Sequence, residues 1–176
     1  MNTMQNQNLQ GHNRYGSATV TLPSDTEILI TRQFDAPAAL VFKAWTTPEL
    51  VKRWWGFDTS EWLVCDIDLR EGGSWRYVTR ESRDAGEFEV GFHGEFHTIE
   101  APHRIVSTEV YEGFPDAVAL NTLVFDEVDG VTTMRVTVVH TCREHRDGHI
   151  ESGMEGGMQI SMNRLEDVVA ELGRAA

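Results

Sequence analysis

Hydrophobic and polar positions near the start of the chain follow first a strand period and then a helix period. Residues 27–34 are rich in β-branched side chains and roughly alternate between apolar and polar, which is typical of a strand. Pro37 favours a first helical turn, and apolar residues over 40–45 recur at helical spacing. Pro48 repeats this start signal before a second apolar stripe that ends at Gly56. The pattern therefore predicts one strand followed by two short helices.

The middle of the chain has a period of two, which indicates antiparallel strands. Glu71-Gly72-Gly73 and Asp129-Gly130 have the composition of tight hairpin turns. Apolar side chains over Val90–Phe96 share one face of a strand whose other face is polar. The strands follow one another without the crossover helices that a parallel sheet needs. Strands are predicted over residues 63–69, 75–79, 89–97, 104–111, 118–128 and 131–140.

A long helix is predicted at the end of the chain. Apolar residues recur at steps of three or four from Met154 to Leu172, Ser152 and Glu155 fit a capping box, and Gly173 is a typical end signal. The stripe covers about five turns, which is long enough to cross a sheet. Because a single sheet must cover its apolar face, we expect an α+β fold in which a curved antiparallel sheet surrounds this helix.

The length and composition suit one domain in a reducing compartment. Residues 1–18 are rich in Gln and Asn and lack an apolar period, so we expect a flexible leader before a single domain at 19–176. The two cysteines, Cys65 and Cys142, cannot provide a disulfide framework. The chain begins without a signal-peptide pattern, and no apolar segment is long enough to cross a bilayer. These features predict a soluble, cytoplasmic protein.

The charge balance argues against nucleic acid as a partner. The formal net charge is -13, and Lys and Arg number 15 against 28 Asp and Glu. Binding to phosphates requires clustered cations, which this composition does not provide, and an anionic membrane surface is disfavoured for the same reason. We therefore expect neither nucleic acid nor membrane as a partner.

Short motifs spread over about residues 27–172 carry a family resemblance. They are Ala36-Pro37, Val41-Phe42, Thr47-Pro48-Glu49-Leu50 with Trp54, Asp66-Ile67-Asp68-Leu69-Arg70-Glu71-Gly72-Gly73, Gly94-Glu95-Phe96 with Ile99, Pro102 and Arg104-Ile105-Val106, and Gly153-Met154, Gly156-Gly157 and Arg164-Leu165-Glu166. Together they resemble the SRPBCC, or START-like, superfamily. Within it, they are closest to the branch named after the activator of the 90-kDa heat-shock-protein ATPase.

The resemblance implies the helix-grip fold, which birch-pollen-allergen-like proteins share, with two short helices after the first strand. It implies no single activity, because one fold hosts many functions and this branch is mostly binding modules. Met158 departs from the pattern, since members commonly carry Trp directly after the second glycine of the helix. The cochaperone activity is not carried over, because the eukaryotic activators have a further N-terminal domain with no counterpart in this sequence.

A group of inward-pointing side chains predicts an internal site for an apolar ligand. Aromatic rings and thioethers suit a pocket that accepts a flat or irregular molecule, although each of them would also serve to fill a core. The candidate ligand-binding residues are Trp75, Tyr77, Phe92, Phe96, Met134, Val136, His140, Met154 and Met158.

His140 and Glu109 are the candidates for acid–base chemistry. Alternation along residues 131–140 places His140 at the inner rim of the cavity, where it would titrate near neutrality. Glu109 shares a strand face with Ser107, whereas Val106 and Val110 favour the opposite face as the inner one. We therefore expect Glu109 to face solvent. No P-loop, nucleophile elbow, His-Glu-x-x-His or dinucleotide motif is present, so phosphoryl transfer and serine hydrolysis have no support.

The chain offers one loose cluster of metal-binding residue types. Cys142, His145 and His149 follow His140 closely, and thiolate and imidazole are common zinc ligands. Their spacing matches no standard site, so we predict no metal and no cofactor. His93 and His97 lie on a strand and are too far apart to chelate.

Three functions are consistent with the sequence. The first is binding of a hydrophobic small molecule or lipid-like metabolite in a cavity. The second is an enzyme of the polyketide cyclase or hydrolase type, which requires His140 or Glu109 to be buried with a perturbed pKa. The third is a cochaperone-like interaction module, which requires an exposed apolar patch around Trp55. The sequence leaves the ligand, a homodimer and a chaperone partner open.

Overall fold

The computed structural model describes residues 14–176, and residues 1–13 of the expected leader lie outside the described part. The described elements are β1 (Thr19–Thr21), β2 (Glu27–Phe34), α1 (Ala38–Thr46), α2 (Pro48–Trp54), β3 (Glu61–Ile67), β4 (Ser74–Arg83), β5 (Gly86–Glu100), β6 (Arg104–Tyr111), β7 (Val118–Val128), β8 (Val131–His140), α3 (Arg143–Glu151) and α4 (Met154–Arg174). This order confirms the α+β helix-grip fold.

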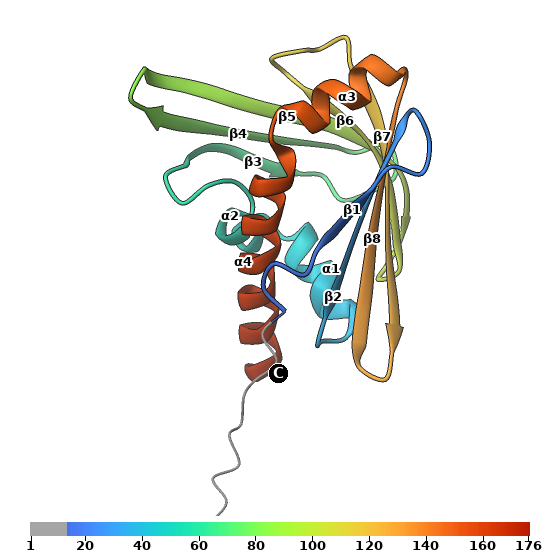
Figure 1. Ribbon diagram of the computed structural model, residues 1–176. Coiled ribbons are helices and arrows are strands. Elements are labelled where there is room, and N and C mark those ends of the chain that lie inside the picture. Colours follow the sequence, from blue (N-terminus) through green and yellow to red (C-terminus); the bar gives the residue numbers. More distant parts are fainter. Residues whose placement is uncertain (1–13) are drawn as a thin grey trace, which may run out of the picture.

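The strands form one antiparallel sheet. Its order is β1-β2-β8-β7-β6-β5-β4-β3, so the first long strand pairs with the last. The bounds of β6, β7 and β8 match the predicted strands. Figure 1 shows β3, β4 and β5 turning away from β2 and β8, so that the sheet curves around α4. The inside of this curve is called the concave face below.

One end of the concave face is a packed core under α1, α2 and the C-terminal half of α4. The rings of Phe42 on α1 and Phe125 on β7 lie 5.9 Å apart, edge to face. The buried indole of Trp54 donates a hydrogen bond to the main-chain oxygen of Ala44 at 2.9 Å. Leu165 and other apolar residues of α4 are buried against this group. Because α1 and α2 fill the space between α4 and the sheet here, this end is closed (Figure 1).

The region before the last helix differs from the prediction. The sequence pattern predicted no helix between residue 140 and the last helix, whereas Arg143–Glu151 form helix α3. The predicted capping box at Ser152 is wrong, because the Ser152 hydroxyl donates to the main-chain oxygen of His149 at 2.6 Å. Gly153 instead breaks the helix with φ of 79°, a left-handed conformation that favours glycine. The chain thereby changes direction between α3 and α4.

A bulge in β3 shifts the expected alternation. The pairing with β4 changes register between Trp62 and Val64, so Trp62 joins Cys65 on the concave face. Leu63 therefore remains 36% exposed, although the regular pattern over 63–69 placed it inside.

The segment Arg14–Ala18 lies along α4. The main-chain nitrogen of Gly16 donates to the Asn163 side chain at 2.9 Å, and the Gln159 amide donates to the main-chain oxygen of Ala18 at 2.6 Å. The last residues of the expected leader are thus in contact with the C-terminal helix. Within residues 14–176, no helix is both long and apolar enough to cross a membrane.

Candidate functional site

Three neighbouring strands place Glu109, Ala119 and His140 in one row on the concave face. Glu109 of β6 is paired with Ala119 of β7, and Ala119 is paired with His140 of β8. Neighbouring strands lie about 4.8 Å apart, so the backbones of Glu109 and His140 are about 10 Å apart. Ala119, whose side chain is a single methyl group, is the residue between them in this row.

Glu109 lies inside the fold, so the expectation that it faces solvent was wrong. Burial raises the pKa of its carboxyl group, and a hydrogen bond from the Asn121 amide opposes that shift. Protein surrounds the carboxyl group, yet the residue keeps accessible surface. Val106 and Val110 suggested the wrong inner face, because each is buried, with 9% exposure, although both lie on the other face of β6. Since both faces of β6 carry buried residues, alternation alone does not identify the inner one.

His140 forms a hydrogen-bonded pair with His149 of α3. Nε2 of His140 lies 3.1 Å from Nδ1 of His149. Burial and the nearby His149 lower the pKa of His140 to about 4, and burial also lowers the pKa of His149. Both rings are therefore neutral at pH 7, and a single hydrogen lies between the two nitrogens. Nδ1 of His140 then donates when His149 is the donor of the pair, and accepts when His140 is.

Two buried polar atoms in this region have no protein partner among the described residues. They are Oδ1 of Asn121 and Nδ1 of His140, and both residues are only 8% exposed. Asn121 is paired with Ser107 on β6, diagonally next to Glu109, so these polar side chains occupy adjacent rows of one face. Buried polar atoms in folded proteins almost always have a hydrogen-bond partner. Two such atoms without one, on the same face of the sheet, therefore require an explanation.

Trp75 extends the row on the other side of Glu109. Gly94 of β5 lies opposite Glu109 by register and is paired with Trp75 of β4. A Cβ atom at Gly94 would lie 1.9 Å from the main-chain oxygen of Thr108 and 2.6 Å from the Trp75 indole nitrogen. Only glycine fits there, and its missing side chain lets the indole lie over the strand toward Glu109.

An aromatic cluster covers the concave face beyond Trp75. The Trp55 ring contacts the rings of Trp62, Tyr77 and Phe92, with centroids 5.4–5.5 Å apart. Tyr111 lies 5.2 Å from Phe92 and is 44% exposed. Trp55 and Phe92 are half-buried. Several ring surfaces at this end of the sheet are therefore not covered by other protein atoms.

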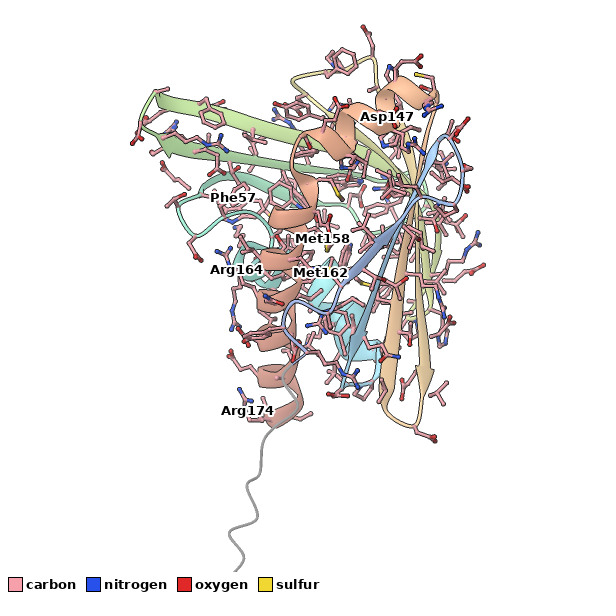
Figure 2. The ribbon with its side chains drawn as sticks, viewed as in Figure 1. Phe57, Asp147, Met158, Met162, Arg164 and Arg174 are labelled. Carbon is pink, nitrogen blue, oxygen red and sulfur yellow. The ribbon has the colours of Figure 1, made fainter. Side chains whose placement is uncertain are left out.

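Helix α4 and the loop after α2 border the same region. Met158 and Met162 point from α4 toward the sheet, whereas Arg164 points away (Figure 2). Arg164 donates to the main-chain oxygen of Gly56 at 2.9 Å and also pairs with Asp58. These contacts hold the loop that carries Phe57, whose ring is 3.5 Å from where a Cβ atom of Gly157 would lie.

The structure brings together most, but not all, of the predicted ligand-binding residues. Trp75, Tyr77, Phe92, Phe96 and His140 share the concave face around Glu109, and Met154 and Met158 lie on the adjoining half of α4. Met134 and Val136 lie on the same face toward the packed end. Met134 is fully buried next to Phe125, six residues and about 20 Å along β8 from His140.

Sequence reasoning missed Asn121, Trp55 and Trp62 as members of this site. Asn121 alternates in step with the buried Ala119, Leu123 and Phe125, so the period of β7 already indicated its inward position. The two tryptophans could not be placed in the same way. Trp55 follows the end of a helix, and Trp62 is turned inward by the bulge in β3.

The residue types that could bind a metal, Cys142, His145 and His149, do not form a cluster. Among residues 14–176, no group of three His, Cys, Asp or Glu side chains is arranged to hold a metal ion. His149 contacts His140, while His145 lies 2.9 Å from the Thr141 hydroxyl and packs edge-on against Phe114. Cys142 is a half-buried free thiol, and burial raises the pKa of the other thiol, Cys65, to about 11.

Comparison with known proteins identifies the family. Residues 35–170 match the model of the family described as "Activator of Hsp90 ATPase homolog 1-like protein". The chain belongs to this family. The match spans every element from α1 to most of α4, and it agrees with the SRPBCC resemblance of the sequence motifs.

Solved structures share the fold of this Hsp90-activator-like family member. A Rhodobacter sphaeroides protein is 25% identical with a TM-score of 0.79, covering 88% of this chain and 99% of its own. A Staphylococcus epidermidis protein is 26% identical with a TM-score of 0.72, covering 87% and 94%. A Mycobacterium smegmatis protein is 24% identical with a TM-score of 0.74, covering 86% and 96%. No curated protein matches the chain.

Proposed function

We propose that this protein binds a small, mainly apolar molecule between the concave face of β4–β8 and the N-terminal half of α4. The observation that carries this proposal is the set of partly uncovered aromatic rings on the concave face, with Trp55 and Phe92 at its centre. Small-molecule sites are typically lined by aromatic and apolar side chains with a few polar groups that fix orientation. The row from Trp75 to His140 has this composition.

The packing of α4 supports the same location. Its main packing partners in the described chain are α1, α2, α3 and β2 rather than β4–β8. Glu109 on β6 keeps accessible surface although its carboxyl group lies within the fold. Accessible surface on an enclosed group is the pattern expected for a side chain that borders an internal space. The side chains of Met154 and Met158 on α4 are flexible and would adapt to the shape of a bound ligand.

The test is a titration of the full chain with naphthalene, in which ¹H–¹⁵N NMR spectra record the change in each amide shift. The amides of β4–β8 around Glu109 are expected to shift, and Ala119→Phe is expected to prevent those shifts by filling the space beside Glu109. Thr122→Phe is the matched control, because Thr122 is on the same strand but on the opposite face. Native mass spectrometry of protein purified from its own host then tests for a retained ligand. Absence of both naphthalene shifts and a retained small molecule would contradict the proposal.

A second candidate function is acid–base catalysis on a bound carbonyl compound. It is favoured by the in-register pair of Glu109, with its raised pKa, and His140, which is neutral. In such a reaction a carboxylate or imidazole takes a proton from the carbon next to the carbonyl group and returns one to it. The test is deuterium exchange into 2-tetralone in D₂O, which Glu109→Gln should abolish while tetralone binding persists. Exchange no faster than in buffer would exclude this function for that substrate class.

A cochaperone-like role has less support from the geometry. That function predicts an exposed apolar patch around Trp55, whereas Trp55 is half-buried and contacts three other rings. A chaperone partner and a homodimer stay predictions from the family name and the sequence.

A further inference from the structure

We propose that Asn121, Glu109 and His140 form the polar end of the binding site and take the neutral hydroxyl group of an otherwise apolar ligand, such as an alcohol or a phenol. This inference rests on the proposed function, because it names the ligand class of the same site.

The first argument is the pair of unpartnered atoms. Oδ1 of Asn121 and Nδ1 of His140 are buried without a protein partner among the described residues. Both residues are more than nine-tenths buried and point to the concave face. Asn121 is paired with Val138, two residues before His140, so the two side chains are diagonal neighbours about 7–8 Å apart at their backbones. In the proposed complex, one small polar group bound between these diagonal neighbours pairs with both.

The second argument is what those atoms require. Oδ1 of Asn121 is a carbonyl oxygen and can only accept hydrogen bonds, and the amide nitrogen of the same side chain donates to Glu109. A ligand therefore has to supply a donor at this point. A hydroxyl group donates one hydrogen bond and accepts others, so it can donate to Asn121 and accept from a protonated Glu109 or from Nδ1–H of His140. A hydrocarbon would leave both atoms unpaired, which costs free energy in a buried site.

The third argument excludes a carboxylate ligand. The buried cations of the described chain are committed elsewhere: Arg32 pairs with Glu166 toward the packed end, and Arg146 pairs with Asp147 at 2.6 Å. The two imidazoles, His140 and His149, are neutral at pH 7 for the reasons given above. An anionic headgroup would therefore lie next to Glu109 without a cation to compensate it, which is unfavourable in a site removed from water.

The experiment compares three probes that share one ring system: naphthalene, 2-naphthol and 2-naphthoate. At pH 7 we expect 2-naphthol to bind about tenfold more tightly than naphthalene, and 2-naphthoate to bind more weakly than either. Asn121→Leu removes the acceptor at similar volume and should bring the naphthol and naphthalene affinities within about threefold of each other. Thr122→Val, on the opposite face of the same strand, should leave the tenfold ratio unchanged. Should Asn121→Leu not fold, Glu109→Leu removes another partner of the hydroxyl group, on the neighbouring strand, and should likewise reduce the preference for 2-naphthol over naphthalene.

The outcomes separate this inference from the function on which it rests. Equal affinity for naphthalene and 2-naphthol overturns the hydroxyl site while leaving an apolar binding site intact. Tightest binding of 2-naphthoate overturns it in favour of an anionic ligand. Failure of all three probes to bind overturns the proposed binding function, and the hydroxyl site with it. A naphthol preference that Asn121→Leu abolishes and Thr122→Val preserves supports the inference.

Discussion

Glu109 and His140 stand in the same row of the sheet, separated by one alanine. Their strands, β6 and β8, are not neighbours, and β7 contributes Ala119 between them. An acid and a neutral imidazole thus lie on one face of the sheet with a small side chain between them. In the proposed function, the charge states of these two residues and the size of residue 119 decide what the site can hold.

Enlarging Ala119, which is 3% exposed, tests the proposed ligand space. The proposal predicts that Ala119→Leu changes the free energy of unfolding by less than about 0.5 kcal/mol, because the added atoms would take the place of the ligand. Ala44→Leu is the comparison, since Ala44 is fully buried in the packed core beneath Trp54. It should cost about 1–3 kcal/mol through overpacking. Urea unfolding measures both variants, and an equal loss of stability in the two would show that the space beside Glu109 is filled.

The raised pKa of Glu109 makes stability fall as pH rises. The folded state keeps this proton at pH values where the unfolded chain, with an ordinary Glu pKa of about 4.3, has released it. Stability is therefore greatest below about pH 4.3 for this group and decreases toward the folded pKa. Glu109→Gln, which is neutral throughout, should gain in stability on wild type as pH rises above about 4.3 in urea unfolding. A variant that gains nothing on wild type as pH rises would contradict the assignment.

His140 has the opposite dependence. Its pKa is lowered to about 4, so the unfolded chain takes up a proton near pH 6.5 that the folded state refuses. The stabilising contribution is present above about pH 6.5 and is lost as pH falls toward 4, by about 1–3 kcal/mol. NMR titration of the imidazole protons should find His140 untitrated until well below pH 6. A midpoint near 6.5 for His140 would contradict its neutral state.

The Arg32–Glu166 pair ties α4 to β2 through a buried cation. The Arg32 side chain has 0% exposure, and it also donates to the main-chain oxygen of Gln33. Glu166→Ala should cost about 3–5 kcal/mol, because it leaves the guanidinium buried without a counter-charge. Glu155→Ala on the same helix is exposed and should be nearly neutral. The double change Arg32→Met with Glu166→Leu should recover most of the loss in urea unfolding; a double variant no more stable than Glu166→Ala would contradict this account.

The fold was predictable because its long strands and last helix carry strong periods. Residues 104–111, 118–128 and 131–140 alternate over many positions, and the Asp129-Gly130 turn fixes the last hairpin. The stripe from Met154 to Leu172 identified α4 in the same way. A period that extends over this many residues identifies the strand or helix even where the pattern does not define its first and last residue.

The polar part of the site was harder to predict because tertiary contacts determine it. Helix α3 has no apolar stripe, and it is held by the His140–His149 contact and by Arg146, which donates to the main-chain oxygen of Ser24 at 2.6 Å. The inner face of β6 depends on which side α4 covers, and Val106 and Glu109 gave opposite indications. The single sequence could name Glu109 and His140 as candidates, but the strand register was needed to place them in one row.

The pairing of β2 with β8, together with the packing of α1 and α2 on α4, joins the beginning of the described chain to its end. During synthesis, the first long strand and the short helices leave the ribosome well before the residues that will cover them. Contacts between such distant segments form slowly, because a long loop must close before they gain anything. Folding of the described domain therefore completes only when α4 has emerged, and a ligand bound as proposed would be enclosed only at that last step.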